Sequence, residues 1–115
     1  LDSESIVSRG QTAEAQTKRQ EAFIAYASGE YEEAIQLFVD VLRVEQDFEV
    51  QFYLANAYFE SKKIKEAIVH FNELTTDQNR YRTRSLWYLV LCQLELKNIP
   101  EAKKIAISLS KEQDS

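Results

Sequence analysis

The stretch from Phe48 to Leu74 reads FEVQFYLANAYFESKKIKEAIVHFNEL. Its apolar residues recur every three or four positions on both sides of a short polar turn at residues 61–63, and this is the period of an α-helix. A turn this short keeps two helices antiparallel and in contact. The stretch therefore predicts an α-helical hairpin, and a hairpin of this length needs neighbours to bury its apolar faces. The residues that form the two apolar stripes are Leu54, Ala55 and Tyr58, then Ala67, Ile68, Phe71 and Leu74.

The composition narrows the class of protein. Two glycines and one proline in 115 residues argue against an all-β fold, which needs many turns. The formal net charge of −5 argues against general affinity for nucleic acid or for an anionic membrane surface. No apolar run approaches the roughly 20 residues that span a bilayer. The first residue is Leu1 rather than Met, which is consistent with a fragment of a longer protein.

Apolar periodicity and helix-end signals predict an all-α fold with about six helices. Gly29 should end the first helix, because glycine adopts a left-handed exit without strain. Asp47 and Asn98 are expected N-caps, and Pro100 suits a first helical turn. We expect a single domain over residues 12–111, preceded by a poorly ordered polar leader (1–11) and followed by a short tail (112–115). The expected helices are 12–28, 31–44, 48–61, 64–74, 82–96 and about 99–109, and they pair into hairpins 12–45, 47–75 and 81–111.

A repeat connects the three hairpins. An alanine near the start of each second helix serves as a ruler: Ala34 to Ala67 is 67 − 34 = 33 residues, and Ala67 to Ala102 is 102 − 67 = 35. A helix–turn–helix unit with a period near 34 resembles the tetratricopeptide repeat (TPR) family. The middle unit carries the family pattern almost completely, whereas Glu21 occupies the leucine position of the first unit and Ala106 the phenylalanine position of the third. The matching residues of the middle unit are Leu54, Ala55, Tyr58, Ala67 and Phe71.

The resemblance implies a superhelical stack of three TPR hairpins in which the first helix of each unit lines a concave groove. It implies a protein or peptide as the partner. The packing tryptophan of the family has Leu86 in its place here, so Trp87 is rotated by about 100° toward the groove. The alternative, that these rings only pack between neighbouring first helices, stays open. The groove candidates are Arg19, Phe23, Tyr26, Phe52, Asn56, Phe59, Arg84, Trp87 and Leu91, with Leu94 on the same face.

The sequence gives little support for an enzyme, a metal site or a cofactor. His70 is the single histidine and Cys92 the single cysteine, and neither has a partner at metal-ligand or catalytic spacing. We expect Cys92 to be a small buried hydrophobe. The carboxylate clamp of TPR domains that hold chaperone tails is incomplete, because this face offers Arg19, Asn56 and Arg84 with Glu49 among them. We expect neither chaperone-tail nor nucleic-acid binding.

Charge is uneven along the chain, with an acidic excess up to Glu45 and a basic excess from Asn79 to Lys111. Such ends could guide head-to-tail stacking, so the alternative to a peptide-binding scaffold is a self-association module that forms a homo-oligomer through its terminal hairpins. A further resemblance, to the soluble TPR portions of bacterial membrane-anchored or cell-envelope proteins, rests on the patterns FYLANAYF and LWYLVL. It leaves the localisation open.

Overall fold

The computed structural model describes the backbone of residues 3–114 and the side chains of residues 13–112. This part of the chain contains six α-helices and no strand, so the predicted all-α fold is confirmed. The leader residues Leu1 and Asp2 and the tail residue Ser115 lie outside the described residues. The helices are α1 (Ser3–Ala27), α2 (Tyr31–Val44), α3 (Phe48–Glu60), α4 (Ile64–Leu74), α5 (Arg82–Glu95) and α6 (Ile99–Asp114).

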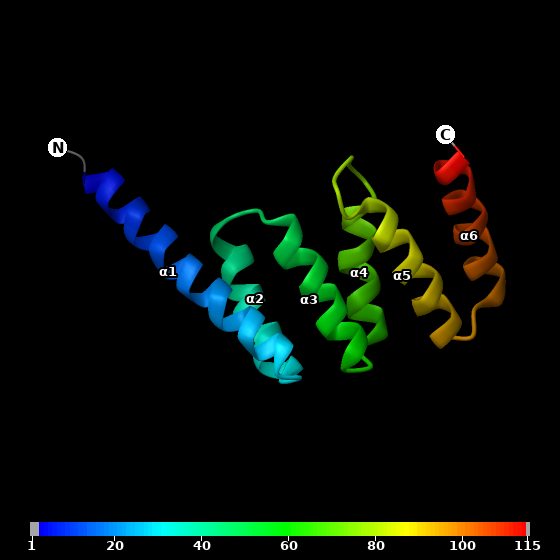
Figure 1. Cartoon of the computed structure of the whole chain (residues 1–115), viewed down its shortest axis with the longest axis horizontal. Coiled ribbons are helices and arrows are strands. Elements are labelled where there is room, and N and C mark those ends of the chain that lie inside the picture. Colours follow the sequence, from blue (N-terminus) through cyan, green and yellow to red (C-terminus); the bar gives the residue numbers. More distant parts are fainter. Residues whose placement is uncertain (1–2, 115) are drawn as a thin grey trace.

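The helices follow one another as an extended row of antiparallel neighbours, with the two ends of the chain at opposite ends of the row (Figure 1). Each helix packs mainly on the helix before it and the helix after it. The molecule measures 57 × 32 × 18 Å. This nearest-neighbour arrangement is that of a helical repeat protein, in which every unit depends on the unit beside it for burial of its apolar faces.

The same turn joins the two helices of every hairpin. Gly29, Lys62 and Lys97 each have a positive φ, of 79°, 66° and 60° respectively, and they are spaced by 33 and 35 residues as the repeat predicts. The residue after each donates its backbone N–H to a carbonyl five residues earlier, as in the Schellman motif. These bonds are Glu30 to Ala25 (2.9 Å), Lys63 to Tyr58 (2.8 Å) and Asn98 to Gln93 (2.8 Å). The predicted role of Gly29 is confirmed.

Alanines and phenylalanines of the repeat form the core. The ruler residues Ala34, Ala67 and Ala102 are buried, and so are Phe38 and Phe71 at the phenylalanine position of the first two units. The small alanine side chains let the helix axes approach one another, while the two phenylalanine rings fill the space between units. The N-cap predicted at Asp47 is also present, because its carboxylate accepts a hydrogen bond from the Val50 N–H at 3.1 Å.

Two helix ends differ from the sequence prediction. Helix α1 begins at Ser3 rather than near Thr12 and continues through Gly10, and α6 extends to Asp114 into the expected tail. A glycine inside a helix costs only about 1 kcal/mol relative to alanine, and the polar residues on either side of it do not interrupt a helix. Polarity was therefore a poor guide to where these helices end. None of the described helices is both long and apolar enough to span a membrane.

The left-handed turn residues give a test of the hairpin geometry. Lys97→Gly should raise the free energy of unfolding by about 0.5–1 kcal/mol, because it relieves the cost of a non-glycine residue at φ 60°. Lys104→Gly, at an exposed position inside α6, should lower it by about 1 kcal/mol. Urea denaturation of both variants measures the difference, and a destabilised Lys97→Gly would contradict the turn.

Candidate functional site

The predicted groove residues occupy three equivalent rows on the first helices of the units. Each row holds three positions on one helix face: 19, 23 and 26 on α1, 52, 56 and 59 on α3, and 87, 91 and 94 on α5. The second row follows the first by 33 residues (52 − 19), and the third follows the second by 35 (87 − 52). We call the face that carries these rows the A-helix surface. The three rows differ in what covers them.

The first row is covered by the beginning and middle of α3. The Arg19 guanidinium donates to the Asp47 carboxylate, with Nε to Oδ2 at 2.9 Å, and to Glu49, and it lies over the Phe23 ring at 4.9 Å. The rings of Phe23 and Tyr26 each contact the Tyr53 ring edge-on at 5.3 Å. Two carboxylates therefore hold Arg19, whose side chain is 32% exposed, and the two rings stay half-buried.

The second row is covered by the loop before α5 and by α5 itself. Phe52 is only 4% exposed, stacked on Tyr81 at 4.9 Å and edge-on to Tyr88 at 5.7 Å. Asn56 is equally buried, and its amide donates to the Phe52 carbonyl at 2.9 Å. For Phe52 and Asn56 the structure thus favours the packing alternative, because neither side chain is accessible to a partner. Phe59 is half-buried, with its ring 5.9 Å from that of Tyr88.

The third row is open. Trp87, Leu91 and Leu94 are 51%, 42% and 45% exposed, and their spacing of four and three residues places them along one face of α5. Leu86, which stands in the position of the family's packing tryptophan, is buried. Arg84 lies one turn before Trp87 and is exposed, with its guanidinium 6.0 Å from the Tyr81 ring. We call Trp87, Leu91 and Leu94 the open stripe.

Tyr53 and Tyr88 are the residues of this surface that sequence reasoning missed. They are 35 residues apart, each is half-buried, and each inserts its ring against the row of the preceding first helix. Tyr88 also stacks on Phe71 at 5.0 Å with an interplanar angle of 8°. Tyr53 and Tyr88 stand at equivalent positions of the second and third units, and this repetition was a signal in the sequence. The family motif does not include this position.

Two tyrosines of the A-helix surface, Tyr26 and Tyr88, have raised pKa values. Burial raises the pKa of Tyr26 to about 12, and Tyr88 and Glu60 are among the neighbours that add to the shift. Burial, with Glu60 beside it, also raises the pKa of Tyr88. Both phenols therefore remain protonated at neutral pH, where they can donate and accept hydrogen bonds. The half-buried part of the surface offers neutral polar groups, while the open stripe offers apolar area.

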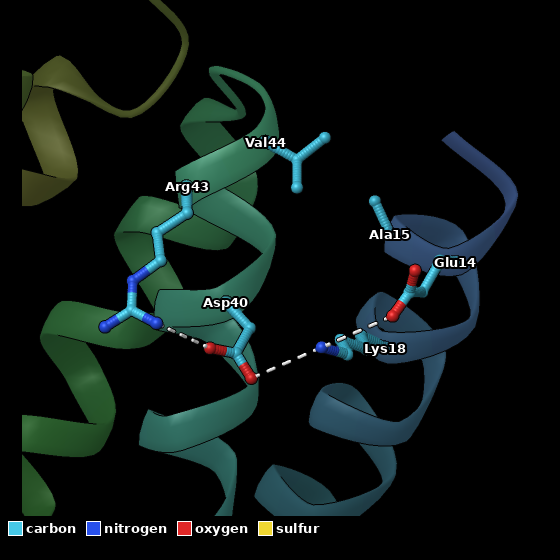
Figure 2. Close-up of a pocket in the computed structure, with 6 residues that line it drawn as sticks. All are labelled: Glu14, Ala15, Lys18, Asp40, Arg43 and Val44. Carbon is cyan, nitrogen blue, oxygen red and sulfur yellow. Dashed lines mark hydrogen bonds and ion pairs between the residues drawn. The ribbon is translucent and has the colours of Figure 1, made fainter. Parts of the chain in front are cut away.

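A hollow of about 350 Å³ lies elsewhere, between α1 and α2 at the first end of the molecule (Figure 2). Its charged residues bind one another: the Lys18 ammonium lies 3.8 Å from Glu14 and 3.5 Å from Asp40, and Arg43 lies 3.2 Å from Asp40. Because these charges are used within the hollow, we place the candidate binding site on the A-helix surface instead.

The single histidine and the single cysteine are not among the residues of the three rows. Burial raises the pKa of the Cys92 thiol to about 12, so the thiol stays protonated, and the side chain is fully buried as predicted. His70 stacks on Tyr58 at 5.6 Å, and burial lowers the pKa of its imidazole. Within residues 13–112, no three His, Cys, Asp or Glu side chains come together as a group that could hold a metal ion.

Comparison with known proteins agrees with the repeat geometry. A family model described as tetratricopeptide repeat matches residues 25–84, which are 60 of the 115 residues. The chain belongs to the TPR family. Searches of curated proteins and of solved structures find no significant match. TPR domains are generally non-catalytic and act in protein–protein interaction, so a protein is the class of partner that this membership indicates.

Alkaline titration tests the burial of the tyrosine cluster. The unfolded chain releases tyrosine protons near pH 10, whereas folded Tyr26 holds its proton to about pH 12. Between these values the folded state binds more protons than the unfolded state, so the stability that Tyr26 contributes is complete below pH 10 and falls as the pH rises. Tyr26→Phe should therefore reduce the loss of unfolding free energy between pH 9 and pH 11.5. Urea denaturation at both pH values measures this, and an equal loss in both proteins would contradict the burial.

Proposed function

We propose that this TPR domain is a non-catalytic interaction scaffold that binds a peptide or protein segment on its A-helix surface, with the open stripe as the principal apolar contact. The observation that carries the proposal is the exposure of Trp87, Leu91 and Leu94 together on one face of α5. Aromatic residues with neighbouring leucines are typical anchors of protein interfaces, and a surface held by rigid helices loses little entropy on binding.

The half-buried rings of the first two rows extend this surface. Phe23, Tyr26 and Phe59 each keep part of their area accessible, and the hydroxyls of Tyr26 and Tyr88 can bond to a partner's backbone. Arg84 adds a positive charge beside Trp87. We place the strongest contribution at the third unit, since Arg19, Phe52 and Asn56 are already engaged within the protein.

Self-association through the terminal hairpins is less well supported as the function. The exposed Ile24 and Val44 at the first end and Ile107 at the last do leave apolar area uncovered. However, Glu21 is exposed on α1 at the position where α3 has the buried Leu54. A copy stacked there as the units stack within the chain would have to bury a carboxylate, which is costly without a partner charge.

Peptide display gives the test. Random 16-residue peptides selected on the wild-type domain should lose at least tenfold in affinity for Leu91→Glu, because a carboxylate would enter the apolar contact. They should retain affinity for Val69→Glu, a matched change at an exposed branched residue of α4. Thermal melting of both variants should match the wild type, since both positions are on the surface. Peptides that bind Leu91→Glu as tightly as the wild type would contradict the proposal.

A further inference from the structure

The protein contains two examples of what covers a row of the A-helix surface. In the first, Tyr53 of α3 inserts against Phe23 and Tyr26 of α1. In the second, Tyr88 of α5 inserts against Phe52 and Phe59 of α3. Each time the covering element is an α-helix laid beside the row, and each time its tyrosine lies between the first and last ring of the pair. The open stripe is the third row of the same series.

The second helix of the third unit also has apolar positions that no described element covers. Ala106 of α6 lies 35 residues after Phe71, whose ring stacks on Tyr88, and Ala106 is exposed. Ile99 corresponds in the same way to Ile64, which packs against the core cluster shared by the second and third units, and Ile99 is 46% exposed. The end of the molecule at α5 and α6 thus presents apolar side chains at positions that are covered in the unit before.

The opposite end differs in character. The positions of α1 equivalent to the buried Val50, Leu54 and Ala57 of α3 are Thr17, Glu21 and Ile24, all of them exposed. Two of the three are polar, so the α1 face is suited to water and the open stripe to an apolar partner. A second copy of this chain would bring Glu21 rather than a leucine and a tyrosine to the stripe. A second copy is therefore a poor occupant of the stripe.

The charges beside the stripe indicate the sign of that partner. Arg84 lies one turn before Trp87, and Lys103 is exposed on α6 at the position equivalent to Ile68. Two acidic residues also lie on this side of the molecule: Glu95 follows Leu94 and lies 3.8 Å from Lys62, and Glu60 lies beside Tyr88. A partner helix would meet the positive charge of Arg84 at the Trp87 end of the stripe and apolar side chains at its centre.

We propose that the open stripe receives an amphipathic α-helix of another protein, which lies beside α5 as α5 lies beside α3, inserts a tyrosine or similar ring between Trp87 and Leu94, and places carboxylates near Arg84 and Lys103. This inference rests on the proposed function and specifies its partner. The helix buries the row that the chain's own helices bury in the first two units. Its aromatic residue takes the place of Tyr53 and Tyr88, and Trp87 becomes covered.

The single tryptophan gives a direct readout, since Trp87 is the only one in the chain and is half-exposed. The probe is a synthetic peptide that copies residues 81–96, held helical by a hydrocarbon staple on the face opposite Tyr88. It carries Trp87→Phe and Cys92→Ala, so that it is silent at the tryptophan wavelength and cannot oxidise, and Arg82→Glu and Arg84→Glu, which supply the carboxylates. There are two control peptides. The first also carries Tyr88→Ala, and the second retains both arginines.

Addition of the probe to the domain should shift the Trp87 emission to shorter wavelength in a saturable manner. The Tyr88→Ala peptide should bind at least about tenfold more weakly, because it lacks the inserted ring. The peptide that keeps its arginines should also bind more weakly, and its deficit should shrink at 1 M salt. The Leu91→Glu domain should not bind the probe, whereas Val69→Glu should bind it as the wild type does.

Three results would overturn the inference. An emission unchanged by the probe, while displayed peptides still bind in a Leu91-dependent way, would leave the proposed function intact and exclude the helical mode. Equal binding of the probe and its Tyr88→Ala control would exclude the inserted ring. An emission that shifts to shorter wavelength when the domain alone is concentrated, with a matching rise in mass by sedimentation, would show that a second copy covers the stripe.

Discussion

This structure depends on one repeated contact, in which a tyrosine of one unit packs into the row on the first helix of the unit before it. The Tyr88 ring lies within 6 Å of the rings of Phe52, Phe59 and Phe71, and so it joins the second unit to the third through both helices of the second. Tyr53 makes the corresponding join between the first and second units. Aromatic pairs in such edge-on and stacked geometries add to the energy of area burial. Because each helix contacts mainly the helix before it and the helix after it, these aromatic contacts hold the stack of helices together.

The same contact explains why an apolar face is open at one end of the described residues. Helix α5 contributes Tyr88 to the unit before it and carries Trp87, Leu91 and Leu94 as a row of its own, and the described residues contain no first helix of a fourth unit to cover that row. At the first end, α1 has polar residues where a preceding unit would pack, so those residues can remain in contact with water. The proposed function thus rests on an asymmetry: two of the three α1 positions that would face a preceding unit are polar, whereas all three residues of the open stripe are apolar.

Much of the fold could be predicted from the sequence, because the repeat is written in residues that must be buried. Ala34, Ala67 and Ala102 located the second helices, and Gly29 located the first turn. Lys62 and Lys97 adopt the same left-handed conformation although neither is a glycine. Only their spacing from Gly29 in the repeat indicates this conformation. The ends of α1 and α6 could not be predicted, since polar residues there are compatible with both helix and coil.

The site was harder to predict, because helical periodicity gives the face of a residue and not what lies against it. It placed Phe52 and Trp87 on equivalent faces, and they differ more than tenfold in exposure, at 4% and 51%. The difference arises from Tyr81 and Tyr88, which cover Phe52 and come from the next unit. Whether a ring is exposed or packs within the protein is therefore decided by whether the first helix of a following unit covers it.

Acrylamide quenching of a single tryptophan at the two equivalent positions tests this account most directly. The wild type reports on position 87, and the double variant Phe52→Trp/Trp87→Phe reports on position 52 in the same fold, with circular dichroism as the check on folding. The account predicts a quenching constant several times larger for the wild type, with emission at longer wavelength. The reason is that Tyr81 and Tyr88 cover position 52, whereas position 87 is half-exposed. Equal quenching at the two positions in folded proteins would contradict it.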